Sequence, residues 1–156
     1  MIIAKRKILF LAVISFFINA SGHASDSKLK IEVKPAKMLV KNGQEISIDT
    51  IIENVGKEVQ RLEVWSCSYY DNWNVDSPFV KLQGWACRKN GVIEVALKPK
   101  EKYEKELRLK INVPAEEIQV EKITFKLGFK ASLNETSNPK EFPIIWSDPI
   151  ILQIKE

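Results

Sequence analysis

The chain has 156 residues, of which 45% are hydrophobic and 28% charged, and this length suits one folded domain. Three of its 24 basic residues and no acidic residue lie in the first 24 positions, so the remainder carries 21 basic against 20 acidic residues, a net charge of +1. A nucleic-acid-binding protein needs concentrated positive potential along one face, and this balance argues against that class.

The first 24 residues have the pattern of a secretory signal peptide. A basic head at residues 5–7 precedes an apolar run at residues 8–18, which is too short to span a membrane. Gly22 and Ala24 are small residues at the two positions that a signal peptidase recognises. We expect cleavage after Ala24, and a single mature domain at residues 25–156 that is periplasmic or secreted and has no transmembrane anchor.

Alternation of apolar and polar residues predicts strands along the whole mature chain. The clearest runs are residues 45–53, residues 103–113 with only Lys105 out of pattern, and residues 123–130. Shorter segments rich in branched or aromatic residues are 29–33, 59–65, 80–82, 92–97 and 149–154. One helical turn is expected at residues 115–118, and a polar hairpin connection at residues 131–141.

Short strands with one apolar face each must bury those faces between two sheets. The sequence therefore predicts an all-β fold, an immunoglobulin-like antiparallel sandwich of about seven to nine strands. A closed barrel is the alternative.

Cys67 and Cys87 are the two cysteines of the chain, and an exported protein folds where thiols oxidise. We expect one disulfide between them, which by the chain-entropy estimate stabilises the fold by roughly 3 kcal/mol. Two free buried thiols are the alternative.

The chemistry of a typical enzyme is missing from the mature chain. The single histidine, His23, lies in the predicted signal peptide, so histidine-dependent triads and histidine-bearing metal sites are excluded. The acidic residues mostly occupy the polar sides of strands, where solvated surface is the ordinary role. We therefore expect no catalytic activity, no cofactor and no metal site.

Residues 66–79 form an unusual connection because they carry four aromatic side chains. Long loops tend to be functional, and aromatic side chains offer large contact area with few torsions to freeze. The candidate binding residues are Tyr69, Tyr70, Asp71, Asn72, Trp73 and, beside the second cysteine, Trp85. The alternatives are a small satellite core under the disulfide and, for Asp71, Asn74 and Asp76, a calcium site, although their spacing matches no standard calcium loop.

Two turns resemble those of bacterial immunoglobulin-like domains: Asn54-Val55-Gly56-Lys57 between two strands, and residues 97–103 entering a long strand. With the Tyr70-Asp71 pair, residues 45–113 are similar to the BsuPI-type proteinase inhibitor domain. Lys100 departs from the family pattern, which has glycine there. The resemblance implies the sandwich fold.

The function that the sequence favours is an exported, non-enzymatic protein-binding or accessory domain that uses the disulfide-bridged aromatic loop. The partner is expected to be another protein of the envelope or the extracellular space. The alternative is an inhibitor or immunity-type protein that acts on a secreted or periplasmic hydrolase.

Overall fold

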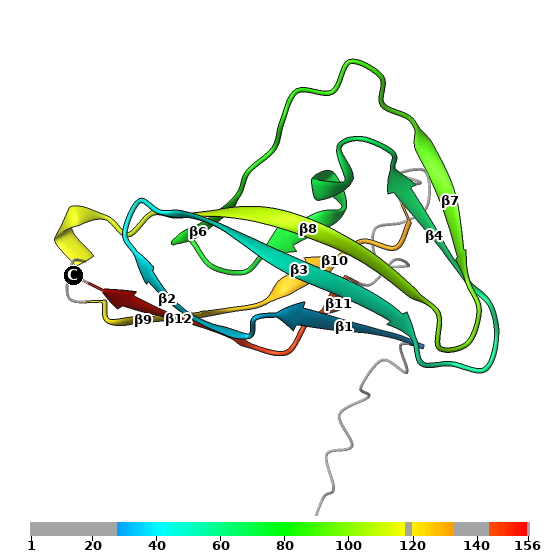
Figure 1. Ribbon diagram of the computed structural model, residues 1–156, viewed down its shortest axis with the longest axis horizontal. Coiled ribbons are helices and arrows are strands. Elements are labelled where there is room, and N and C mark those ends of the chain that lie inside the picture. Colours follow the sequence, from blue (N-terminus) through cyan, green and yellow to red (C-terminus); the bar gives the residue numbers. More distant parts are fainter. Residues whose placement is uncertain (1–27, 118–119, 133–143, 156) are drawn as a thin grey trace, which may run out of the picture.

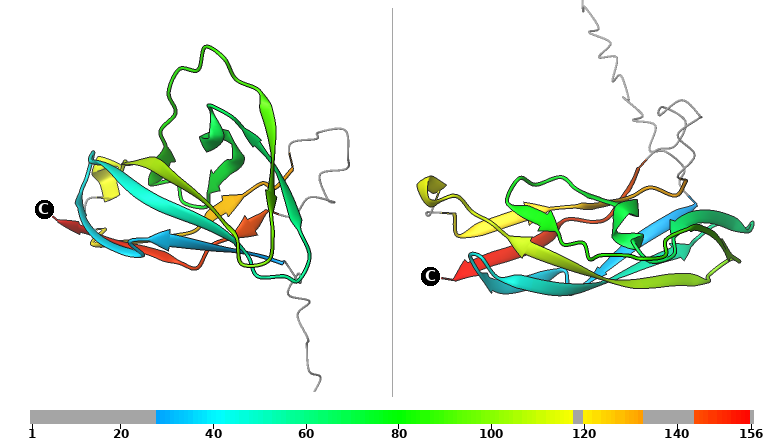
Figure 2. Two further views of the ribbon diagram at one scale, coloured as in Figure 1. Left: turned by 45° about the vertical axis from the view of Figure 1, so that its right-hand side comes forward. Right: turned by 90° about the horizontal axis from the view of Figure 1, so that it is seen from above.

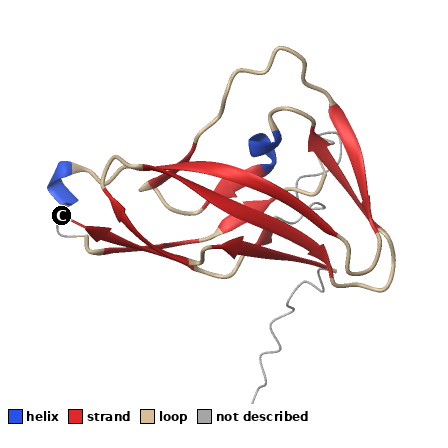
Figure 3. Ribbon diagram, in the orientation of Figure 1, coloured by secondary structure: helices blue, strands red, loops and turns tan. Residues whose placement is uncertain are grey.

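The computed structural model describes residues 28–117, 120–132 and 144–155, and it consists almost entirely of strands (Figure 1, Figure 3). The predicted signal peptide and most of the predicted polar connection lie outside these residues. The described strands are β1 (Leu29–Lys34), β2 (Lys37–Lys41), β3 (Glu45–Asn54), β4 (Gln60–Trp65), β5 (Trp73–Val75), β6 (Val80–Leu82), β7 (Val92–Leu97), β8 (Lys102–Ile111), β9 (Lys122–Phe125), β10 (Leu127–Phe129), β11 (Ile145–Trp146) and β12 (Ile150–Lys155).

Two short 3₁₀ helices interrupt the strands, η1 (Tyr69–Asn72) and η2 (Ala115–Glu117). The second of them is the single turn that the sequence predicts after β8. In the described part of the chain, no helix is long and apolar enough to cross a membrane.

The strands form two facing layers, seen edge-on in the right-hand view of Figure 2. One layer has the strand order β1-β3-β8-β6, and the other contains the sheets β11-β10-β5 and β2-β12-β9. Strands β1, β3, β8 and β6 correspond to strands A, B, E and D of an immunoglobulin-like domain. Strands β11, β10 and β5 of the other layer correspond to G, F and C. The predicted all-β, immunoglobulin-like sandwich with one disulfide is confirmed.

The core lies between the layers and comes from the predicted alternation. The inward side chains of the two long central strands are almost fully buried and belong to one hydrophobic cluster with those of β9, β10 and β12: Ile46, Ile48, Ile52, Leu107, Leu109, Ile111, Ile123, Phe125, Leu127, Phe129, Ile150 and Leu152. Each such side chain stabilises the fold by about 1.5–3 kcal/mol relative to an exposed one.

The run at residues 123–130, predicted as one strand, is divided between two sheets. The Lys126 N–H bonds the Asp76 carboxylate at 2.6 Å, and the next N–H bonds the Ser147 hydroxyl at 3.1 Å. Beyond this point Leu127, Gly128 and Phe129 are all buried, so the alternation ends. At the point where the predicted strand is divided, side chains from other parts of the chain accept the backbone N–H groups that a continuous strand would use for pairing.

Strands β4 and β7 lie outside the immunoglobulin-like pattern. The end of β3 lies beside the beginning of β8. Strand β4, which follows β3, and strand β7, which precedes β8, pair with each other beyond a corner. The side chain of Asn54 stabilises this corner: its amide donates to the carbonyls of Glu58 and Leu97, at 2.7 Å each, and its oxygen accepts the Gly56 N–H. In Figure 1 the β4–β7 ribbon rises from the end of the sandwich.

Candidate functional site

A disulfide braces the segment that joins β6 to β7. Residues 83–91, here called the arch, project from the edge of the sandwich (Figure 1). Cys87 in the arch is bonded to Cys67, which follows β4, and their Cα atoms are 6.0 Å apart, an ordinary separation for a disulfide. The predicted pairing is therefore confirmed, and a disulfide is typical of proteins that fold in oxidising compartments.

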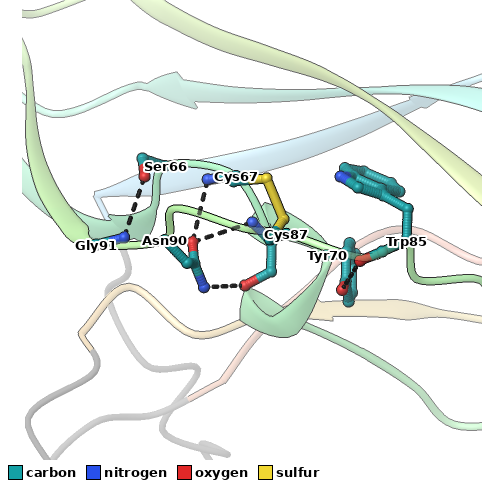
Figure 4. Close-up of a disulfide and its surroundings, with 8 residues drawn as sticks. Ser66, Cys67, Tyr70, Trp85, Cys87, Asn90 and Gly91 are labelled. Atoms are coloured by element: carbon teal, nitrogen blue, oxygen red, sulfur yellow. Dashed lines mark hydrogen bonds between the residues drawn. A yellow bond between two sulfur atoms is a disulfide. The ribbon is translucent and has the colours of Figure 1, made fainter.

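Asn90 ties the arch to the same segment a second time (Figure 4). Its side-chain oxygen accepts the N–H groups of Cys67 and Ser68, both at 3.2 Å, and its amide donates to the Ser68 hydroxyl at 2.6 Å. Arg88 and Lys89 lie between these two attachments, and both are exposed. Two cations are therefore held on a short, doubly anchored loop.

Three aromatic side chains meet beside the disulfide and are here called the aromatic cluster: Tyr69, Tyr70 and Trp85. The Trp85 ring makes edge contacts with both tyrosines, at centroid distances of 5.0 Å and 4.6 Å. The Tyr70 hydroxyl donates to the Trp85 carbonyl at 2.8 Å (Figure 4). All three side chains are partly exposed, so the cluster is neither a sealed core nor a free loop.

Gly84 lets Tyr70 approach the arch. A Cβ at this position would stand 2.7 Å from the Tyr70 ring, closer than real contacts allow. The absence of a side chain at Gly84 therefore lets the tyrosine pack directly on the backbone next to Trp85.

Lys105, the residue that breaks the alternation of β8, extends the cluster. Its ammonium lies 5.0 Å from the centre of the Tyr69 ring and 5.3 Å from that of Tyr103, both within cation–π range. Burial raises the pKa of Tyr103 to about 12, with a further contribution from Tyr69. Burial also raises the pKa of Tyr69, which the charge of Glu106 raises further and that of Arg108 lowers.

Two of the predicted binding residues lie in the core. Asn72 is 0% exposed and bonds backbone groups of β4 and of the segment after β10: its oxygen accepts the Trp65 N–H, and its amide donates to the carbonyls of Glu63 and Lys130. Trp73 is 4% exposed, and its ring packs on Phe129 at 5.0 Å. The predicted loop is in fact η1, which ends at Asn72, followed by β5, which begins at Trp73 and pairs with β10.

The other oxygen-bearing side chains of this segment include Asp71 and Asp76, two of the three residues considered above for a calcium site. Asp71 is exposed, and the carboxylate of Asp76 accepts the backbone N–H of Lys126. Across residues 28–117, 120–132 and 144–155, no group of three His, Cys, Asp or Glu side chains is arranged to hold a metal ion.

The sequence interpretation missed Lys105, Arg88 and Lys89. The signal for Lys105 was available, because a lysine on the apolar side of a strand needs a partner. The two arch cations carry no such signal, since their grouping depends on the anchors at Cys87 and Asn90.

No family model matches the chain, and no curated protein matches it. Among solved structures 21 chains match. One comes from the complex between zinc 2-glycoprotein and prolactin inducible protein from human seminal plasma, with 12% identity, a TM-score of 0.43, and coverage of 85% of this chain and 99% of that chain.

A second is AvmM, which catalyses macrocyclization in alchivemycin A biosynthesis; it has 14% identity, covers 83% of this chain and 89% of its own, and has a TM-score of 0.42. The third is the N-terminal domain of the Streptococcus gordonii adhesin Sgo0707, with 13% identity and a TM-score of 0.34. That match covers 83% of this chain but 33% of the adhesin chain. These structural similarities do not assign a function to this protein.

Proposed function

We propose that this protein is an exported, non-enzymatic binding domain that meets a protein partner through the arch and the aromatic cluster. The observation that carries the proposal is the double anchoring of the arch, by the disulfide and by Asn90, beside partly exposed aromatic rings. An anchored loop has little conformational entropy to lose on binding. Tryptophan, tyrosine and arginine are the residues that most often dominate binding energy at interfaces.

The chemistry of the arch indicates an acidic partner surface. Arg88 and Lys89 are exposed, and the arch contains no acidic residue. Charges of one sign speed the encounter with a surface of the opposite sign and suppress like-charged partners.

The test compares the wild-type protein with two variants as immobilised baits in a secreted or periplasmic extract. Trp85→Ala removes the central ring of the aromatic cluster, and Trp146→Ala is the matched control, because Trp146 is 42% exposed and lies over Gly128 in another sheet. A partner retained by the wild type and by Trp146→Ala should fall about tenfold or more with Trp85→Ala, the loss expected when a buried interface aromatic is truncated. Equal capture by all three baits contradicts the proposal.

Charge reversal provides a second variant that leaves the fold intact. Arg88→Glu with Lys89→Glu changes only exposed side chains, so the unfolding curve should stay unchanged while capture weakens and its dependence on salt diminishes.

Hydrolase inhibition is the second candidate. The arch is convex and projects from the domain (Figure 2, left), and such loops insert into concave sites. Titration of the protein against purified periplasmic proteases and cell-wall hydrolases tests this candidate, and an unchanged rate for every enzyme argues against it.

A further inference from the structure

Strand β7 lies at the edge of a two-stranded sheet. Within the described residues, β7 pairs with β4 alone, in an unbroken register from Val92 to Leu97. Its sequence, Val-Ile-Glu-Val-Ala-Leu, favours strands and contains no proline, lysine or glycine. Natural proteins usually protect an edge strand with proline or charged residues, especially lysine, with a bulge, or with a covering segment. The single charged residue of β7, Glu94, is paired with Arg61 of β4, and the register of β7 contains no bulge.

The exposure of the side chains on β4 and β7 also favours an added strand. On the face that looks toward the core, Leu62 and Val64 of β4 are fully buried, yet their direct neighbours on β7 are not. Exposure along that face of β7 rises from 3% at Leu97 to 47% at Ile93, and Val95 is intermediate. The apolar layer therefore extends past β4 and is left uncovered along β7. A strand added beside β7 would cover Ile93 and Val95 with its own apolar side chains.

The charges at both ends of β7 indicate which kind of segment could pair with this strand. Arg88 and Lys89 precede the strand, and Lys98 and Lys100 follow it, all exposed. The next acidic residue along the chain, Glu101, has its carboxylate bonded to the Lys98 N–H at 2.8 Å. A second copy of this chain paired antiparallel along β7 would bring like charges together at both ends. A segment with acidic ends would meet opposite charges there.

We propose that β7 binds an extended segment of a partner protein by strand addition, and that this segment is apolar at alternate positions and acidic at both ends. Backbone hydrogen bonds to the free edge give the pairing, and the apolar side chains complete the layer above Ile93 and Val95. The inference deepens the proposed binding function, because the arch runs directly into β7. It names the conformation and the chemistry of the bound segment.

The experiment uses a capped synthetic peptide, Asp-Glu-Val-Thr-Val-Thr-Val-Glu-Asp, and the same peptide with lysine at the four acidic positions. Amide hydrogen exchange of the full protein follows the β7 N–H groups that do not bond β4. We expect these amides to exchange freely in the unbound protein and to become protected with the acidic peptide. The lysine peptide should bind at least about tenfold more weakly, since four favourable charge contacts are replaced by repulsive ones.

Two variants at neighbouring positions separate strand addition from adhesion to an apolar patch. Ile93→Lys places a charge where the added strand must bury it, whereas Val92→Lys places the same charge on the opposite face of β7 at the same exposure, 49% against 47%. We expect about a tenfold or greater loss of peptide affinity for Ile93→Lys and a change within about threefold for Val92→Lys. Neither substitution removes a buried side chain, so both variants should keep the wild-type unfolding midpoint.

The inference is overturned if the β7 amides are already protected in the free protein, if the two variants lose affinity equally, or if light scattering shows a dimer that Ile93→Lys dissociates. Absence of peptide protection at millimolar concentration also refutes strand addition. If the baits described above still capture a partner in a Trp85-dependent way, that result rejects only the edge-pairing mode and leaves the binding function standing.

Discussion

Replacing Asn72 by alanine should destabilise the fold strongly. The Asn72 side chain accepts the Trp65 N–H at 3.1 Å and donates to the carbonyls of Glu63 and Lys130 at 2.9 Å and 3.1 Å. Alanine at this fully buried position would leave three backbone groups without their hydrogen bonds to the Asn72 side chain. Each buried polar group left unpaired costs about 1–3 kcal/mol, and a water molecule entering the space recovers part of that cost. We expect a net loss of about 3–5 kcal/mol in the free energy of unfolding.

Urea unfolding followed by tryptophan fluorescence measures this loss. The matched control is Asn74→Ala, because the amide nitrogen of Asn74 is buried and has no hydrogen-bond partner among the described residues, so its removal should cost less than about 1 kcal/mol. The slope of free energy against urea should be unchanged in both variants. If Asn72→Ala unfolds within about 1 kcal/mol of the wild type but no longer captures a partner, Asn72 belongs to the binding surface and the structural role is wrong.

Two further predictions concern a turn and a buried phenol. Lys100 has a φ of 69° at the third position of the turn Lys98-Pro99-Lys100-Glu101, where glycine is favoured, so Lys100→Gly should raise stability by about 0.5–1 kcal/mol in urea. Lys98→Gly, at a position without positive φ, is the control and should lower it; a loss for both substitutions would refute strain at Lys100.

Because burial favours the neutral phenol of Tyr103, its pKa in the fold is about 12, against about 10 in the unfolded chain. The stabilisation it provides is complete below pH 10 and is lost as pH rises toward 12, by about 1–2 kcal/mol after allowance for solvent screening. Tyr103→Phe should remove this part of the pH dependence. An unchanged slope between the two proteins would contradict the assignment.

The sequence by itself determined the class of fold and its covalent brace. The alternation along β3 and β8, broken in β8 only at Lys105, specifies one buried face for each strand, and side chains that must leave water require a second layer. A single cysteine pair leaves one possible pairing, and the structure contains that disulfide. These features depend on the local residue pattern and on the number of cysteines, so they can be predicted from the sequence.

Only the tertiary structure decided which aromatic residues face solvent. Asn72 and Trp73 lie in the same polar-aromatic stretch as Tyr69 and Tyr70, yet both are buried. The pairing of β5 with β10 places Trp73 inward, and Asn72 bonds backbone groups of β4 and Lys130. Strand β2, which the sequence analysis did not predict, likewise depends on parallel pairing with the distant β12. Burial and strand pairing depend on segments that are far apart in the chain. The residue pattern of one segment does not show which distant segment it will pair with. The physical reason is that hydrogen bonds and packing between distant segments, rather than the residues of one segment, determine where each side chain points.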